Sequence, residues 1–117
     1  MTARTALRRG DVVLVAFPFT DLSGAKRRPA MIVGRVQSDV LVMAFITSRT
    51  GLSSSPSSHL INPGDPEFLS SGLRVASTLR LDRLATLHRR LVTRRLGAIG
   101  PWTLLAVERC LRHVLDL

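Results

Sequence analysis

The chain has 117 residues, 45% of them hydrophobic, and its mean hydropathy is +0.21. This length fits one domain with a real core and excludes two, and no apolar run approaches the roughly 20 residues that span a bilayer. Seventeen basic against eight acidic residues give a net charge of +9, which favours a polyanionic partner such as RNA, DNA or an acidic protein.

The N-terminus and the cysteine content bear on the compartment. Cys110 is the only cysteine, so no disulfide forms within the chain and we expect a cytoplasmic protein. An apolar run follows the early arginines, but Pro18 interrupts it and a small-residue cleavage site is lacking, so we expect no signal peptide. We expect residues 1–7 to be a flexible leader to a single domain.

Three strand-like runs, separated by polar turns, fill the first part of the chain. Val12–Phe19 is β-branched and aromatic, and the polar loop Thr20–Lys26 leads from it to the second run, Pro29–Val36. A tight turn at residues 37–39 leads into the third, Val40–Thr47. Strands joined by short turns predict an antiparallel meander rather than a parallel sheet.

The second part begins with a loose segment, Ser48–Asp65, which is rich in serine, glycine and proline. His59–Asn62 within it is a candidate edge strand, and Phe68–Gly72 is a candidate helical turn. Three further strands are expected, at Arg74–Arg80, Leu81–Leu87 and Leu91–Ile99.

A helix closes the chain. Pro101 follows Gly100 and suits the first helical turn, where its missing N–H does no harm. Apolar residues then recur at Leu104, Val107 and Leu111 with helical spacing. The sequence therefore predicts a mainly β (α+β) fold, a small curled antiparallel sheet or β-barrel with a C-terminal α-helix packed on it.

Several kinds of site are not supported. The three histidines are far apart, and neither CxxC nor HxxxH spacing occurs, so we predict no metal site. GxSxG and GxxxxGK[ST] motifs are missing, which argues against a serine hydrolase and a P-loop protein. The chain has no tyrosine, which excludes tyrosine-based nicking of nucleic acid.

A basic cluster, Lys26, Arg27 and Arg28, ends the first polar loop directly before Pro29. The planar fork of an arginine donates two parallel hydrogen bonds to an oxyanion, and a rigid neighbour helps to fix its aim. We interpret Arg28 as a phosphate clamp, and Lys26 and Arg27 as groups that position phosphates. The competing interpretation is a solvated surface cluster.

From Arg8 almost to its end, the sequence resembles the MazF/PemK family of toxins from bacterial toxin–antitoxin pairs. The residues that carry the resemblance are the opening RxGDVVLVxFP, the strand RPAMIVG, the turn FIT and the stretch LRLD. The resemblance implies an SH3-like barrel, a homodimer and an acidic antitoxin partner. It also implies cofactor-free and metal-independent cleavage of single-stranded RNA at short specific sequences.

Arg28 and Thr47 match the usual catalytic pair of this family, and Arg80 and Asp82 match the arginine and aspartate that have acid and base roles in its PemK-like branch. Metal-free cleavage uses the neighbouring 2′-OH as nucleophile, so Arg28 and Thr47 would stabilise the anionic phosphorane and Asp82 would take the proton. An ordinary aspartate is a weak base at pH 7, so this role needs burial or strain. Residues assigned to RNA binding are Lys26, Arg27, Ser48, Arg49, Thr20 and Asp21.

The same residues also fit other interpretations. Thr47 is equally suited to capping a turn, and Arg80 and Asp82 share one strand face and suit a plain surface ion pair. The first loop lacks the histidine or glutamate of some relatives, so Asp21 is a second candidate base. At the level of function, the alternatives are a gyrase-binding toxin of the same fold, which would depend on the terminal helix, and a catalytically inactive RNA-binding relative.

Overall fold

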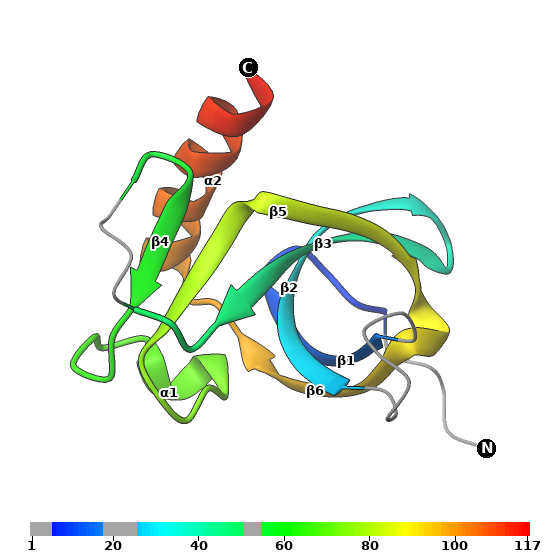
Figure 1. Cartoon of the computed structure of the whole chain (residues 1–117), viewed down its shortest axis with the longest axis horizontal. Helices are drawn as coiled ribbons and strands as arrows, with labels where there is room; N and C mark the ends of the chain where they lie inside the picture. Colours follow the sequence, from blue (N-terminus) through cyan, green and yellow to red (C-terminus); the bar gives the residue numbers. More distant parts are fainter. Residues whose placement is uncertain (1–5, 18–25, 51–54) are drawn as a thin grey trace.

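The computed structural model describes residues 6–17, 26–50 and 55–117 (Figure 1). The elements in chain order are β1 Asp11–Phe17, β2 Lys26–Gln37, β3 Val40–Thr47, β4 Ser58–Ile61, α1 Phe68–Ser71, β5 Ser77–His88, the 3₁₀ turn η1 Arg89–Leu91, β6 Val92–Ala98 and α2 Pro101–Leu115. Among these described elements, neither α-helix is long and apolar enough to cross a bilayer.

All strands join one antiparallel sheet in the order β4-β5-β3-β2-β1-β6. This arrangement confirms the mainly β class with a C-terminal helix. The sheet curls on itself (Figure 1), but within the described residues no ladder joins its edge strands β4 and β6. The expected barrel is therefore not closed, because β4 pairs with the first part of β5 on the far side of the sheet from β6.

The two strands expected at Arg74–Arg80 and Leu81–Leu87 form a single bent strand, β5, which starts at Ser77. Its pairing with β3 shifts register between Ala44 and Phe45, which pair with Leu84 and Arg80. Residues 81–83 are therefore extra on β5, and extra residues of this kind bend a strand. The apparent break in the sequence pattern was a bulge within one strand.

Strand β2 begins at Lys26, three residues before the expected start at Pro29. Residues Lys26, Arg27 and Arg28 pair with Phe17, Ala16 and Val15 of β1. The basic cluster is thus carried by a strand and not by the preceding loop, which fixes its backbone and sends successive side chains to opposite faces of the sheet.

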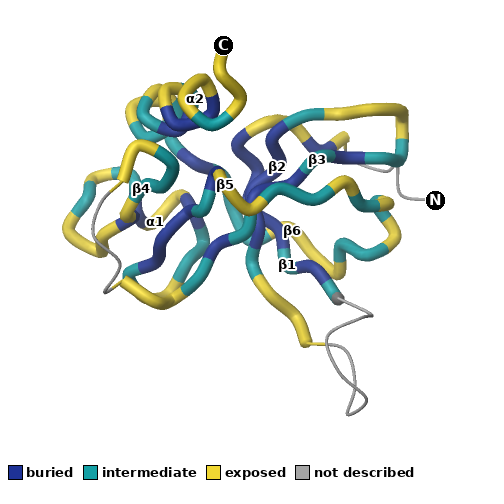
Figure 2. Tube along the Cα trace, turned by 45° about the horizontal axis from the view of Figure 1, so that its top comes forward, coloured by how far each residue is buried: buried dark blue, intermediate teal, exposed yellow. Residues whose placement is uncertain are grey.

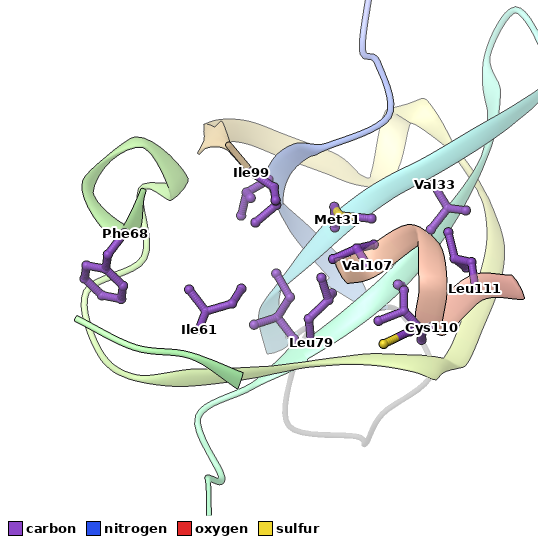
Figure 3. Close-up of a cluster of buried hydrophobic side chains, with 13 residues drawn as sticks. Met31, Val33, Ile61, Phe68, Leu79, Ile99, Val107, Cys110 and Leu111 are labelled. Atoms are coloured by element: carbon purple, nitrogen blue, oxygen red, sulfur yellow. The ribbon is translucent and has the colours of Figure 1, made fainter. Parts of the chain in front are cut away.

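Two apolar clusters occupy the two faces of the curled sheet. The inner cluster fills the curl and contains Leu7, Val13, Val15, Ala30, Ile32, Leu41 and Met43. Leu7 is only 4% exposed, so the packed domain starts before the expected end of the leader. The other cluster lies between the sheet and α2, where Met31 and Leu79 of the sheet face Val107 and Leu111 of the helix (Figure 3).

The Gly10-Asp11 pair fixes the backbone conformation at the point where the chain enters β1. Gly10 has a φ of 97°, a left-handed conformation that favours glycine. The Asp11 side chain is largely buried and accepts a hydrogen bond from the Arg8 N–H at 2.8 Å and another from Arg95 Nε at 3.2 Å. This motif therefore ties the first strand to the last one.

Helix α2 buries one side and exposes the other, as expected from its apolar spacing (Figure 2). Its N-cap, Gly100, has no capping side chain, and Glu67 from the segment before α1 fills that role. The Glu67 carboxylate accepts hydrogen bonds from the N–H of Trp102 at 3.0 Å, the N–H of Thr103 at 2.8 Å and the Thr103 hydroxyl at 2.8 Å. Desolvation raises the pKa of Glu67, but these hydrogen bonds together outweigh it and lower the pKa.

The helix cap predicts a pH-dependent contribution to stability. A lowered carboxyl pKa stabilises the fold above the ordinary glutamate pKa and ceases to do so as pH falls through the folded-state value. We expect Glu67→Gln to lower the melting temperature at pH 7 and to flatten its decline towards about pH 3. The matched control is Glu108→Gln, which removes only an exposed ion pair with Arg9. An equal pH profile for both variants in thermal melts would contradict the capping role.

Candidate nucleic-acid interface

An open groove of about 760 Å³ lies at the exposed start of β2. Its walls come from the middle of β1, the start of β2, the end of β3, the segment between α1 and the start of β5, and β6. Figure 2 shows this end of β2 as an exposed stretch of the trace. The predicted site residues that line the groove are Lys26, Arg27, Arg28, Thr47 and Ser48.

The groove opens where β2 loses its contact with β3. The ladder between these strands ends at Ala30 and Phe45, whereas β2 stays paired with β1 as far as Lys26. Pro29 stands at this point, and a proline has no N–H to donate to a ladder. Arg28 and Thr47 lie two residues beyond this last pair, each on its own strand, and strand alternation turns both side chains to the sheet face of Ala30 and Phe45.

Hydrogen bonds hold the chain that leaves β3 beside the groove. Thr47 Oγ1 accepts a hydrogen bond from the Arg49 N–H at 3.2 Å, and Thr78 Oγ1 donates one to the Arg49 carbonyl at 2.9 Å. Thr47 thus caps this turn, and because its oxygen is the acceptor, its hydroxyl hydrogen is left to donate to a ligand. Arg49 itself does not line the groove.

Three arginines that no sequence motif marks also line the groove: Arg74, Arg94 and Arg95. Arg95 pairs with Asp11. The other basic side chains that line the groove form no ion pair with a carboxylate in the described part of the chain. The run Arg94-Arg95 was visible in the sequence, but adjacent strand residues face opposite sides, so only the fold shows that both reach this groove.

Arg80 and Asp82 lie outside the lining of the groove and bind each other. Their side chains form a bidentate pair at the bend of β5, with Arg80 Nε 2.9 Å from Asp82 Oδ1 and Nη2 2.8 Å from Oδ2. Arg80 is paired with Phe45 across the ladder, so it shares a sheet face with Thr47. The pair therefore lies on the same side of the sheet as the candidate catalytic residues, one strand further on.

This pairing changes the chemistry of Asp82. The hydrogen bonds from Arg80 are the main reason that the pKa of Asp82 is lowered, and Asp82 in turn raises the pKa of Arg80. A base role was expected to require burial or strain that strengthens the carboxylate as a proton acceptor. The structure shows the opposite shift, so Asp82 is fully ionised at neutral pH but is a weaker base than an ordinary aspartate.

Two predicted RNA-binding residues, Thr20 and Asp21, lie outside the described residues. Within residues 6–17, 26–50 and 55–117, no group of three or more His, Cys, Asp or Glu side chains is close enough together to hold a metal ion.

The chain is similar to known toxins over almost its whole length. Residues 8–115 match the family described as PemK-like, MazF-like toxin of type II toxin–antitoxin system. Comparison with curated protein sequences gives no match.

Solved structures share the fold. MazF from Deinococcus radiodurans has a TM-score of 0.71 and 18% identity, covering 97% of this chain and 100% of that one. The Mycobacterium tuberculosis toxin MazF-mt6 gives 0.70 and 17%, with coverages of 92% and 97%. A mycobacterial endoribonuclease in complex with its cognate antitoxin gives 0.70 and 20%, with coverages of 93% and 94%. Because the family pattern spans nearly the entire sequence, this chain belongs to the PemK-like, MazF-like toxins of type II toxin–antitoxin systems.

Proposed function

We propose that this protein is the toxin of a toxin–antitoxin pair and cleaves single-stranded RNA at specific short sequences without a metal ion. The observation that carries the proposal is that Arg28 and Thr47 line one open groove together with several other arginines. The family match supports it, and so does the fold shared with proteins described as endoribonucleases.

The proposed reaction is a transesterification within the RNA. The 2′-oxygen attacks the adjacent phosphorus, the bond from phosphorus to the 5′-oxygen breaks, and the products carry a 2′,3′-cyclic phosphate and a 5′-hydroxyl. One proton leaves the 2′-OH and one reaches the departing 5′-oxygen. Arg28 donates its fork to the phosphorane oxygens, and the Thr47 hydroxyl donates to the same group, so both act where negative charge develops.

We assign the removal of the 2′-OH proton to Asp82, with Arg80 supporting the charge. Hydrogen bonds from Arg80 lower the pKa of Asp82, and the pair lies on the same sheet face as Thr47, one strand further on. The same shift makes it a weak base, so its share of the rate enhancement belongs at the low end of general base catalysis, about 10²-fold.

Asp82→Asn tests this assignment. We expect kcat for RNA cleavage to fall about 10²-fold with little change in KM, because the amide cannot take a proton. The matched control is Asp116→Asn, which neutralises a carboxylate at the end of α2, in a left-handed conformation that asparagine tolerates. If kcat fell by less than about 3-fold, Asp82 would not be the base. Arg80 and Asp82 would then form only an exposed ion pair, worth about 0.2–1 kcal/mol of stability.

The proposed function is tested by incubating the purified protein with a long RNA in EDTA and mapping the product ends. Cleavage at a recurring short sequence, with cyclic phosphate and 5′-hydroxyl ends, is the expected result. A DNA gyrase supercoiling assay run in parallel tests the binding alternative, in which gyrase is inhibited and RNA stays intact. RNA that is bound but left uncut, with gyrase unaffected, would identify an inactive RNA-binding relative.

We further propose that the toxin is a homodimer and that its antitoxin is acidic. The net charge of +9 and the arginine-lined groove favour an acidic partner segment that covers the groove. Sedimentation at micromolar concentration tests the dimer, and a monomer there would contradict it.

A further inference from the structure

A second groove, of about 410 Å³, lies next to the first and is also basic. Its lining residues are Leu7, Arg89, Val92, Thr93, Arg94 and Arg95. Arg94 and Arg95 line both grooves. The two grooves therefore adjoin at β6, the edge strand of the sheet.

The pairing of β6 explains how two neighbouring arginines reach both grooves. Successive residues of a strand face opposite sides of a sheet, and β6 pairs with β1 through two register shifts. These shifts lie on either side of the Arg94-Arg95 pair, because Leu96 and Thr93 are the residues skipped in the ladder. Such bulges twist an edge strand and redirect its side chains.

The charges along this path are nearly all positive. Arg89 belongs to η1 and is half-buried, whereas Arg94 is exposed. Neither forms an ion pair with a carboxylate of the described residues, and Asp11 neutralises only Arg95. No acidic side chain lines the second groove. A polyanion that leaves the first groove at β6 therefore meets a continuous series of arginines.

We infer that the RNA strand crosses the β6 edge and continues into the second groove, where Arg89 and Arg94 bind phosphates away from the scissile bond. This inference rests on the proposed function, because an RNA whose scissile phosphate lies at Arg28 must extend beyond the first groove. Contacts of arginine with phosphates hold the strand in position and do not read its bases. The second groove thus adds affinity that depends on RNA length.

The experiment measures binding of the full chain to labelled 2′-O-methyl oligouridylates, which cannot be cleaved, of about 5 and about 15 nucleotides. We expect Arg89→Ala to weaken binding of the long oligomer about 3- to 10-fold and to leave the short one unchanged within about 2-fold. The slope of log affinity against log salt should fall by about 0.7 for the long oligomer. Arg89→Lys should restore most of the affinity, because lysine keeps the charge.

Arg112→Ala is the matched control, since this exposed arginine of α2 lines neither groove. Equal losses for both oligomers with Arg89→Ala, or no loss, would overturn the inference. The inference would also be overturned if Arg89→Ala weakened the binding of an oligoglutamate of matched length but did not weaken the binding of RNA. Cleavage of a long RNA is scored separately: cleavage without the Arg89 effect refutes only the second groove, and the Arg89 effect without cleavage refutes only the proposed nuclease activity.

Discussion

Replacing Arg28 with alanine is expected to lower kcat for RNA cleavage by about 10²- to 10³-fold while KM changes little. The reason is the position of the side chain, which lines the same groove as Thr47 and lies beside the rigid Pro29. A preorganised donor aimed at the phosphorane acts in the transition state more than in the bound substrate. The measurement is steady-state cleavage of an RNA that contains the mapped site.

Arg27→Ala is the control for charge and binding. Arg27 precedes Arg28 on β2 and lines the same groove, but strand alternation points it to the other face. We expect this variant to raise KM and to keep kcat within about 3-fold. Arg28→Lys adds a further test, because it keeps the charge and loses the planar fork, so a large loss of kcat is still expected. If Arg27→Ala and Arg28→Ala lowered kcat equally, Arg28 would contribute only positive charge and would have no specific role in the transition state.

A large effect on stability is expected from Gly97→Ala. A Cβ at Gly97 would overlap the carbonyl oxygen of Ser70 and lie 2.6 Å from the carbonyl carbon of Ser71. Both obstacles are backbone atoms at the end of α1, so no side-chain rotation relieves the overlap. We expect the free energy of unfolding to fall by about 3 kcal/mol, at the upper end for overpacking, and the melting temperature to fall by roughly 10–15 °C.

Gly34→Ala is the matched control for this substitution. Gly34 lies in β2 of the same sheet, and a Cβ there has no neighbour within 4 Å. We expect its unfolding free energy in denaturant titration to stay within about 1 kcal/mol of that of the parent protein. If the two variants were equally stable, α1 would not be docked on β6 as the structure shows. Because the segment that follows α1 carries Arg74 into the groove, Gly97→Ala should also weaken RNA binding.

Much of the fold was predictable from local patterns. Strands β1, β3 and β6 and helix α2 were expected within one or two residues of their described bounds, because β-branched runs and the spacing of Val107 and Leu111 are local signals. The start of β2 at Lys26 was not predicted, and neither was the continuity of β5 as one strand. Charged residues at a strand end resemble a loop, and a bulge at residues 81–83 resembles a break between strands.

The candidate site was predictable in part. Arg28, Thr47, Lys26, Arg27 and Ser48 were identified from the sequence, and the structure places all of them at one groove. Their catalytic and RNA-binding roles remain predictions. The other groove arginines come from distant segments, and nothing local marks which of sixteen arginines meet there.

The sequence by itself determined the strong positive charge, most of the strands, the terminal helix and the motifs that mark the toxin family. These properties depend on composition and on short-range periodicity. Only the tertiary structure decided that the barrel stays open, that Asp82 is held by Arg80, and that the arginines of β6 join those of β2. The physical reason is that strand pairing and bulges set the register between distant segments, and the register decides which side chains share a face.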